Sequence, residues 1–156
     1  MLIGKRVRRN RKGDYEIRLP DEERSLLRTV IPQLGDLLDG DLADPALRRL
    51  FPTAYADDPE KDIAYQRLVR DELADRRRAA ARIMLDTIEA RRIDEAQLYA
   101  WMSAVNDLRL VLGTRLDVSE ETDLMAAPHD PDGPLLALYA YLGYLLEAIV
   151  EAVSRP

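Results

Sequence analysis

One arginine lies where helical spacing predicts an unbroken line of apolar side chains. Between residues 95 and 116, one helical face gathers Leu98, Trp101, Met102, Val105, Leu108, Leu112 and Leu116. Arg109 falls within about 20° of Leu98 and Leu116 on the same wheel, near the centre of this stripe. A buried guanidinium without a partner costs several kcal/mol. The spacing therefore predicts that a carboxylate from another helix neutralises Arg109 inside the protein.

Glu72 is the best-placed carboxylate for this role. It borders the apolar stripe of a long helix, one turn before Arg76. We expect a buried Glu72–Arg109 pair, with Arg76 and Asn106 completing the hydrogen bonds. Two roles stay open: the cluster fixes the packing of two helices, which is the commoner role of buried ion pairs, or it lines an anion-binding cleft or a dimer seam. Replacing Arg109 with Met separates them, because lost binding with an intact fold favours the second role and unfolding favours the first.

Six cations and no acid occur in the first twelve residues. They are Lys5, Arg6, Arg8, Arg9, Arg11 and Lys12. Clustered Lys and Arg side chains neutralise phosphates, so this basic arm is a candidate contact for nucleic acid. The same charges suit the solvated edge of a β-sheet, where they discourage pairing with another sheet. Both interpretations stay open.

The residue types for catalysis or metal binding are scarce. Cysteine is absent, and the single histidine, His129, lies in a turn rich in proline and aspartate. Disulfides, thiol catalysis and a nucleophile–base pair built on cysteine are therefore excluded within this chain, and a metal site lacks a second ligand cluster. We expect a non-enzymatic protein with no cofactor and no metal.

Composition predicts a soluble cytoplasmic domain spanning residues 1–156. The apolar fraction is 47%, the charged fraction 33% and the net charge −6, and no signal peptide is visible. The most apolar stretch, residues 135–153, has only twelve uncharged residues before Glu147. A membrane-spanning helix needs about 20. We therefore expect this stretch to be the central helix of a soluble bundle, with no membrane contact.

The elements that would position these residues follow from hydrophobic spacing and turn signals. Residues 1–19 predict a basic β-hairpin that turns at Asn10 to Gly13, with Tyr15, Ile17 and Leu19 docked on helices. Residues 21–153 predict a bundle of four principal helices and two short ones. The principal helices are expected at 21–40, kinked or split at Pro32, at 59–90, at 95–116 and at 134–153, and the short ones at 44–51 and 119–127. The apolar stripe expected on the second helix is Tyr65, Val69, Leu73, Ala80, Ile83, Met84 and Thr87.

Three segments carry a resemblance to a known family. They are "LVRDELADRRR" (68–78), "WMSAVNDLRLVLGTRLDVSEE" (101–121) and "YAYLGYLLEAIVEAV" (139–153). With them the sequence resembles an actinobacterial family of unknown function that includes the actinomycete oxidative-stress regulator. The resemblance implies a mostly helical cytoplasmic protein with a role in transcription through contact with other regulators such as sigma factors. The thiol-based mechanism of that family needs a cysteine pair, so it does not carry over to this chain.

Together these observations predict a regulatory or adaptor protein that acts through protein–protein contacts, with the basic arm at DNA as a further contact. The alternative is a helical domain that binds a small anion or metabolite in a cleft holding Arg109 and Arg76. A homodimer is also expected, because Tyr139, Tyr141 and Tyr144 point in different directions around the last helix and cannot all be interior.

Overall fold

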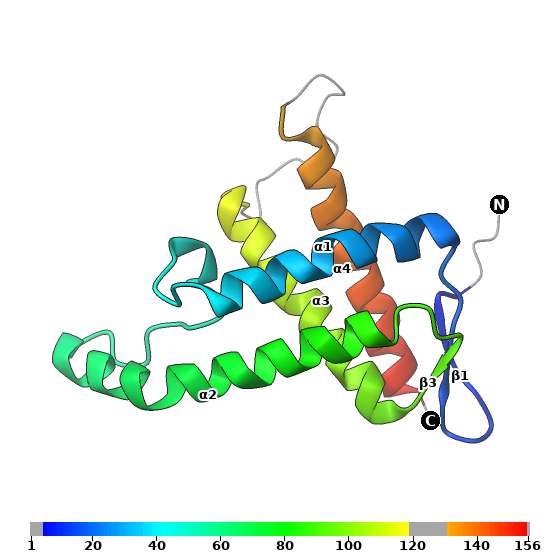
Figure 1. Ribbon diagram of the computed structural model, residues 1–156, viewed down its shortest axis with the longest axis horizontal. Coiled ribbons are helices and arrows are strands. Elements are labelled where there is room, and N and C mark those ends of the chain that lie inside the picture. The colour runs from blue at the N-terminus through cyan, green and yellow to red at the C-terminus, as the bar shows by residue number, and fades with distance from the viewer. Residues whose placement is uncertain (1–4, 119–130, 156) are drawn as a thin grey trace.

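The protein folds mainly into helices, with a small sheet at its N-terminus (Figure 1). The computed structural model describes residues 5–118 and 131–155. The helices are α1 (Asp21–Asp39), α2 (Pro59–Asp86), α3 (Glu95–Arg115), α4 (Gly133–Ser154) and the 3-10 helix η1 (Pro45–Leu47), and the strands are β1 (Val7–Arg9), β2 (Tyr15–Ile17) and β3 (Arg92–Ile93). The predicted fold class is confirmed. The second short helix, expected at 119–127, lies outside the described residues.

The four long helices form two crossing pairs. In Figure 1, α1 and α2 run side by side in opposite directions, and the antiparallel α3 and α4 pass across them. α1 continues through Pro32 as one helix, so the expected split is wrong. Asp58 and Asp94 cap α2 and α3 by accepting backbone N–H bonds, from Lys61 and Gln97 respectively.

The sheet lies against one end of the helical body. The Asn10 side chain accepts the backbone N–H of Lys12 and Asp14, at 2.9 and 3.0 Å, and Gly13 adopts a φ of 87° that favours glycine. β1 pairs antiparallel with β2, which confirms the predicted hairpin. β2 also pairs with β3, a two-residue strand that the sequence analysis did not predict.

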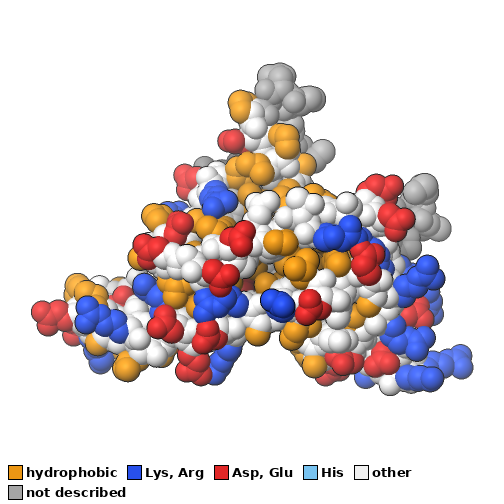
Figure 2. Space-filling model, in the orientation of Figure 1, with side chains coloured by type: hydrophobic (Ala, Val, Ile, Leu, Met, Phe, Trp, Pro, Cys, Tyr) orange, Lys and Arg blue, Asp and Glu red, His pale blue; other side chains and the backbone are white. Residues whose placement is uncertain are grey.

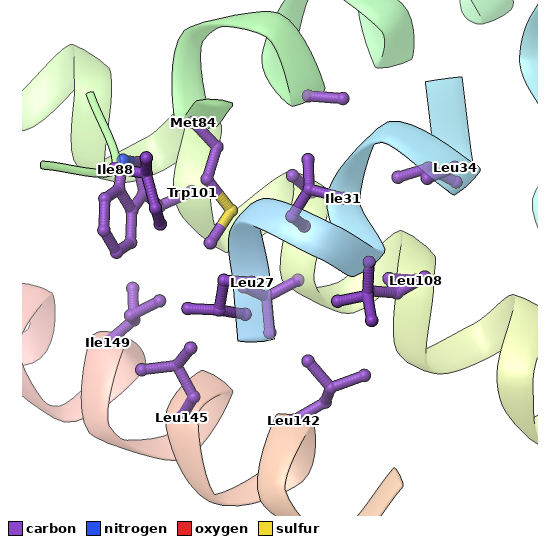
Figure 3. Packing of buried hydrophobic residues seen from close by; sticks show 14 of the residues in the cluster. Leu27, Ile31, Leu34, Met84, Ile88, Trp101, Leu108, Leu142, Leu145 and Ile149 are labelled. Carbon is purple, nitrogen blue, oxygen red and sulfur yellow. The ribbon is translucent and has the colours of Figure 1, made fainter. Parts of the chain in front are cut away.

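The core forms where the two helix pairs cross (Figure 3). Leu27 and Ile31 of α1 point toward the apolar side chains of the other helices, and Trp101 of α3 is completely buried. The Trp101 indole donates a 2.7 Å hydrogen bond to the Thr87 hydroxyl, so its polar atom is satisfied. The predicted docking of Tyr15, Ile17 and Leu19 is confirmed, since all three are buried.

The central helix is α3, and the expectation that α4 lies at the centre is wrong. α3 buries eleven residues spread around its circumference, whereas α4 buries Leu136, Leu142, Leu145, Ile149 and Ala152.

Among the described residues, α4 is the one helix long and apolar enough to cross a membrane by length and composition, but core helices of soluble proteins pass the same test. Only 28% of its most apolar window is buried.

The apolar stripe predicted on α2 is correct in part. Ala80 and Met84 are buried, and Val69, Leu73 and Thr87 are half-buried. Tyr65 and Ile83, both expected in the stripe, are more than a third exposed. The residues that α2 buries are Gln66, Ala74, Ala80, Ala81 and Met84. Polar groups of α2 also bond to the segment between α1 and α2. One example is the 3.0 Å bond from the Gln66 amide to the Pro52 carbonyl.

Candidate functional site

Arg109 lies at the contact between α3 and α4 and is half-buried. Its guanidinium carbon lies 4.8 Å from the centre of the Tyr139 ring, which is a cation–π contact. Its Nε is buried and has no hydrogen-bond partner among the described residues. A Cβ added to Gly143 would lie 3.3 Å from this Nε, so α4 approaches Arg109 closely at a glycine. An aromatic ring, and no carboxylate of the described chain, therefore faces this cation.

The predicted Glu72–Arg109 pair is wrong. Glu72 instead accepts a 2.7 Å bond from Arg76 one turn along α2, and the two side chains are 66% and 72% exposed. Because the polar face of α2 carries both residues outward, neither reaches the α3–α4 contact. The predicted hydrogen bonds from Arg76 and Asn106 to this pair are wrong as well. Asn106 is half-buried on α3, and its side chain makes no hydrogen bond within the described residues.

An ion pair with a buried carboxylate joins Arg77 to Asp107. Asp107 is 1% exposed and Arg77 is 25% exposed, and the Arg77 guanidinium donates to an Asp107 carboxylate oxygen. Arg77 also donates a 3.2 Å bond to the Leu50 carbonyl. Burial raises the pKa of Asp107 above its usual value, and the charge and hydrogen bond of Arg77 oppose that rise. The pair therefore connects α2, α3 and the segment after η1.

The apolar stripe predicted for residues 95–116 does not include Asp107, so its burial was not expected. The sequence pattern could not have predicted this burial. A helical wheel shows in which direction each side chain points, but not how many other helices pack around the helix. Arg24 was also missed, although it lies three residues before Leu27, on the buried side of α1, and spacing could have revealed it.

Arg24 fastens the sheet to the helices. Its side chain is 6% exposed and donates to four backbone carbonyls, which belong to Ile17, Leu19, Ile88 and Ala90. Burial lowers its pKa from the ordinary arginine value, and Asp21 acts in the opposite direction. Because all of these partners are neutral carbonyls, Arg24 serves to position β2 and the turn before β3 against α1.

The six residues of the basic arm have different surroundings. Lys5, Arg8, Arg11 and Lys12 are exposed. Arg9 donates a 3.4 Å bond to the Arg155 carbonyl at the end of α4. Figure 2 shows blue side chains gathered at the lower right, where the hairpin lies. Most of the arm is therefore open to a partner.

Arg6 is the member of the arm that lies inside a network. Its guanidinium forms a 2.9 Å ion pair with Glu23 of α1, and the Tyr141 hydroxyl of α4 donates a 2.8 Å bond to the same carboxylate. The bond to Glu23 raises the pKa of Arg6, and burial raises that of Tyr141. This network holds β1 to two helices, so Arg6 is a structural cation of the hairpin.

A partly exposed apolar surface follows the contact between α3 and α4. Tyr99, Met102, Asn106 and Arg109 recur at spacings of three and four on α3, and Tyr139, Gly143, Leu146 and Val150 do so on α4. Because Arg109 packs on Tyr139 and Gly143, the two faces adjoin. We call these eight residues the α3–α4 seam. Tyr99 and Val150 are 43% and 44% exposed.

Other hollows and possible ligand clusters offer less. A hollow of about 500 Å³ between β1 and α4 mixes arginines with Glu147 and Glu151. Within the described residues no group of three or more histidine, cysteine, aspartate or glutamate side chains could hold a metal ion. His129 lies outside those residues.

Known proteins similar to this chain carry a regulatory name. The oxidative stress regulator AosR of Mycobacterium tuberculosis strain H37Rv is 32% identical over 124 residues, which cover 69% of this chain and 57% of that protein. Its counterpart in Mycobacterium leprae is 32% identical over 127 residues, 70% of this chain and 58% of that protein. The chain thus spans less than two thirds of these relatives. No solved structure matches it significantly.

The family assignment covers nearly the whole chain. Residues 4–153 match a family described as a domain of unknown function, DUF2017. The match extends from the basic hairpin to the last turns of α4, and the relatives in mycobacteria confirm the actinobacterial resemblance. The chain therefore belongs to the DUF2017 family.

Proposed function

We propose that this chain is a non-enzymatic regulatory protein that acts by binding another regulatory protein through the α3–α4 seam. The names of its mycobacterial relatives support a regulatory role. The partner class, a sigma factor or another regulator, follows the family resemblance, and the cytoplasm is the compartment that such a partner requires. The basic hairpin supplies a further contact, to DNA.

The composition of the seam carries this proposal. Protein interfaces are enriched in aromatic residues, methionine and arginine, and their strongest contacts come from tyrosine, tryptophan and arginine. The seam combines Tyr99, Tyr139, Met102 and Arg109 with the aliphatic Val150. The half-buried guanidinium of Arg109 adds a positive charge at the seam for a partner's carboxylate.

The exposed apolar residues of α2 lack this arrangement. On α2, Ile63, Tyr65 and Leu68 are exposed, at 53%, 39% and 80%. Ile63 points about 160° from Tyr65 and about 140° from Leu68 around the helix, so the three side chains do not form one aligned face. Scattered apolar side chains are ordinary on a soluble surface, whereas an aligned group marks a contact site.

The signal that such a regulator receives does not act on a thiol of this chain. The relatives are named for oxidative stress, and this chain has no cysteine. In this proposal the partner senses the signal. A change in the partner alters its affinity for this chain, because binding couples the states of the two proteins.

The proposal is tested by binding the purified sigma factors of the source bacterium to the chain, one at a time. We expect binding by at least one, a loss of roughly tenfold or more in a Tyr99→Ser/Val150→Ser variant, and no change in an Ile63→Ser/Leu68→Ser control. Light scattering of the chain alone tests the homodimer, which would occupy the same seam. Equal binding by both variants, or neither sigma binding nor dimerisation, contradicts the proposal.

One observation supports a second candidate function, which is the binding of a small anion. The buried Nε of Arg109 lacks a partner among the described residues, and an anion could accept its hydrogen bond. Arg76 no longer belongs to this alternative, because it pairs with Glu72 at the surface. A thermal shift with phosphate, sulfate or nucleotides that Arg109→Met abolishes would favour it. The absence of any shift would reject it.

A further inference from the structure

The outer face of the sheet brings together cations from three separate segments. Arg8 of β1 lies opposite Glu16 of β2, which lies opposite Arg92 of β3. Because the neighbouring residues Val7, Tyr15, Ile17 and Ile93 are buried, strand alternation directs the row of Arg8, Glu16 and Arg92 outward. Two strand spacings separate Arg8 from Arg92, about 10 Å.

Further cations extend this row. Arg11 and Lys12 form the tip of the hairpin, Arg18 follows β2, and Arg91 precedes Arg92. All are exposed. We call Arg8, Arg11, Lys12, Arg18, Arg91 and Arg92 the basic sheet face. Because Arg91 and Arg92 lie 73 to 84 residues further along the chain than the other four cations, this surface is formed by the fold and not by the N-terminal arm alone.

The charges of this face are largely available. Arg18 pairs with Glu16 at 2.9 Å, whereas the side chains of Arg8, Arg11 and Arg92 make no hydrogen bond or ion pair with the described part of the chain. Residues 5–18 hold seven basic and two acidic side chains, although the whole chain has a net charge of −6. A local positive field on an acidic protein orients the molecule toward a polyanion.

The side chains of the basic sheet face indicate which kind of polyanion it binds. No large apolar side chain is exposed in residues 5–18 or 91–93, so the face lacks the apolar centre of a protein interface and the apolar anchor of a membrane-binding surface. Arginine forks match phosphate oxygens in pairs. A two-stranded ribbon also fits the major groove of B-form DNA, which is about 12 Å wide, but not the narrow major groove of duplex RNA.

We propose that the basic sheet face binds the phosphate backbone of duplex DNA, with the tip of the β1–β2 hairpin directed into the major groove. This inference deepens the proposed function and rests on it for the DNA contact, whose residues it now names. Arg6 is excluded because it belongs to the network with Glu23. We expect binding to depend chiefly on the phosphate backbone, because Arg8, Arg18, Arg91 and Arg92 lie outside the hairpin tip.

Two sets of largely buried contacts make this face rigid enough to act as a unit. The Arg6–Glu23 pair and the Tyr141 bond hold β1 to α1 and α4. Arg24 holds β2 and the turn before β3 through four carbonyls. The cations therefore keep their spacing without ordering a flexible arm on binding, which would cost free energy.

The test measures fluorescence anisotropy of a labelled duplex of mixed sequence, between about 50 and about 200 mM salt. The variant Arg8→Gln/Arg11→Gln/Arg92→Gln removes one cation each from β1, the hairpin tip and β3. The control Arg48→Gln/Arg67→Gln/Arg115→Gln removes three exposed arginines elsewhere, so both variants carry the same net charge. Circular dichroism checks that both fold.

For the wild type we expect salt-dependent binding. The first variant should bind roughly tenfold or more weakly, and the slope of log affinity against log salt should become shallower by about 2.7, while the control changes by less than about twofold. Equal losses in both variants, no binding by the wild type, or tighter binding to phosphatidylserine vesicles than to DNA would overturn the inference. The Tyr99→Ser/Val150→Ser variant should bind DNA as the wild type does. The DNA inference and the proposed binding of a protein partner through the seam can therefore fail independently.

Discussion

α3 and α4 are almost equal in length, yet the more polar helix is the more buried. α3 carries Asp107 and Arg109 among its 21 residues and buries eleven of them, whereas the charged residues of the 22-residue α4 are Glu147 and Glu151, and it buries five. The other helices and η1 surround α3, while α4 contacts chiefly α3 and β1. Burial therefore follows position in the fold, and the apolar surface that α4 leaves uncovered is available to a partner.

The largest expected effect is on the α3 side of this comparison. Trp101→Ala should lower the free energy of unfolding by about 3–5 kcal/mol, because it leaves a cavity in the centre and removes the bond to Thr87. Urea unfolding measures the change. Val150→Ala on α4 is the matched control, with an expected loss below about 0.5 kcal/mol. Similar losses at both positions would remove the distinction between the helices.

The buried pair of α3 should give the next largest effect. Arg77→Met should cost about 2–3 kcal/mol near neutral pH, below the usual cost of breaking a buried pair because the Arg77 side chain is a quarter exposed. The substitution removes the group that opposes the raised pKa of Asp107, so this pKa rises further. Protonated Asp107 needs no cation, so the loss should shrink as the pH falls toward about 4.

A double variant isolates this pH dependence. With Asp107→Asn added to Arg77→Met, no carboxylate remains to titrate at this position, and the difference from Asp107→Asn alone should be constant with pH. Unfolding at several pH values gives both comparisons. A loss in Arg77→Met that does not change with pH would mean that the raised pKa of Asp107 does not contribute to stability.

A smaller effect is expected where the two helices meet. Gly113→Ala on α3 would place a Cβ 3.0 Å from both an Arg49 nitrogen and the Tyr139 ring. Overpacking should cost about 1–2 kcal/mol, partly offset by the better helix propensity of alanine. Gly35→Ala on α1, which meets nothing within 4 Å, should instead stabilise by up to about 1 kcal/mol. Thermal unfolding measures both changes. Equal changes in stability for Gly113→Ala and Gly35→Ala would contradict the close contact of α3 with Tyr139 and Arg49.

Much of the fold could be predicted from sequence because its signals are local. Hydrophobic spacing, the capping aspartates Asp58 and Asp94, and the turn at Asn10 identified the long helices and the hairpin. Helix α1 spans Asp21–Asp39, within one residue of the predicted 21–40, and no side chain caps it at Pro20. β3 could not be predicted, since two residues form a strand only where β2 is already in place.

The candidate site was harder to predict because it depends on which helices are neighbours. The stripe of α3 was correct at Leu98, Trp101 and Leu108, which are buried. The ion pair was predicted inside the protein but assigned to Glu72 and Arg109, whereas Arg77 and Asp107 form it. A carboxylate on the nominally polar side of α3 becomes buried only when α2 covers that side.

Substitutions in the α3–α4 seam should change the stability of the protein least. They should, however, greatly weaken its binding to a partner. Tyr99→Ser and Val150→Ser should each alter the free energy of unfolding by less than about 0.5 kcal/mol, since both side chains are more than two fifths exposed. Urea unfolding alongside the binding assay shows whether the two properties separate. A large destabilisation would place these residues in the core and not at a contact surface.

The most direct measurement uses the absence of cysteine, because a Val150→Cys variant has a single thiol on the seam. Its rate of reaction with a thiol reagent should fall roughly tenfold or more when a binding sigma factor, or a second copy of the chain at high concentration, covers the seam. The Ile63→Cys variant on α2 should react at the same rate throughout. Unchanged reaction at position 150 in a demonstrated complex, or equal protection at both positions, would contradict the claim that this surface is where the protein meets its partner.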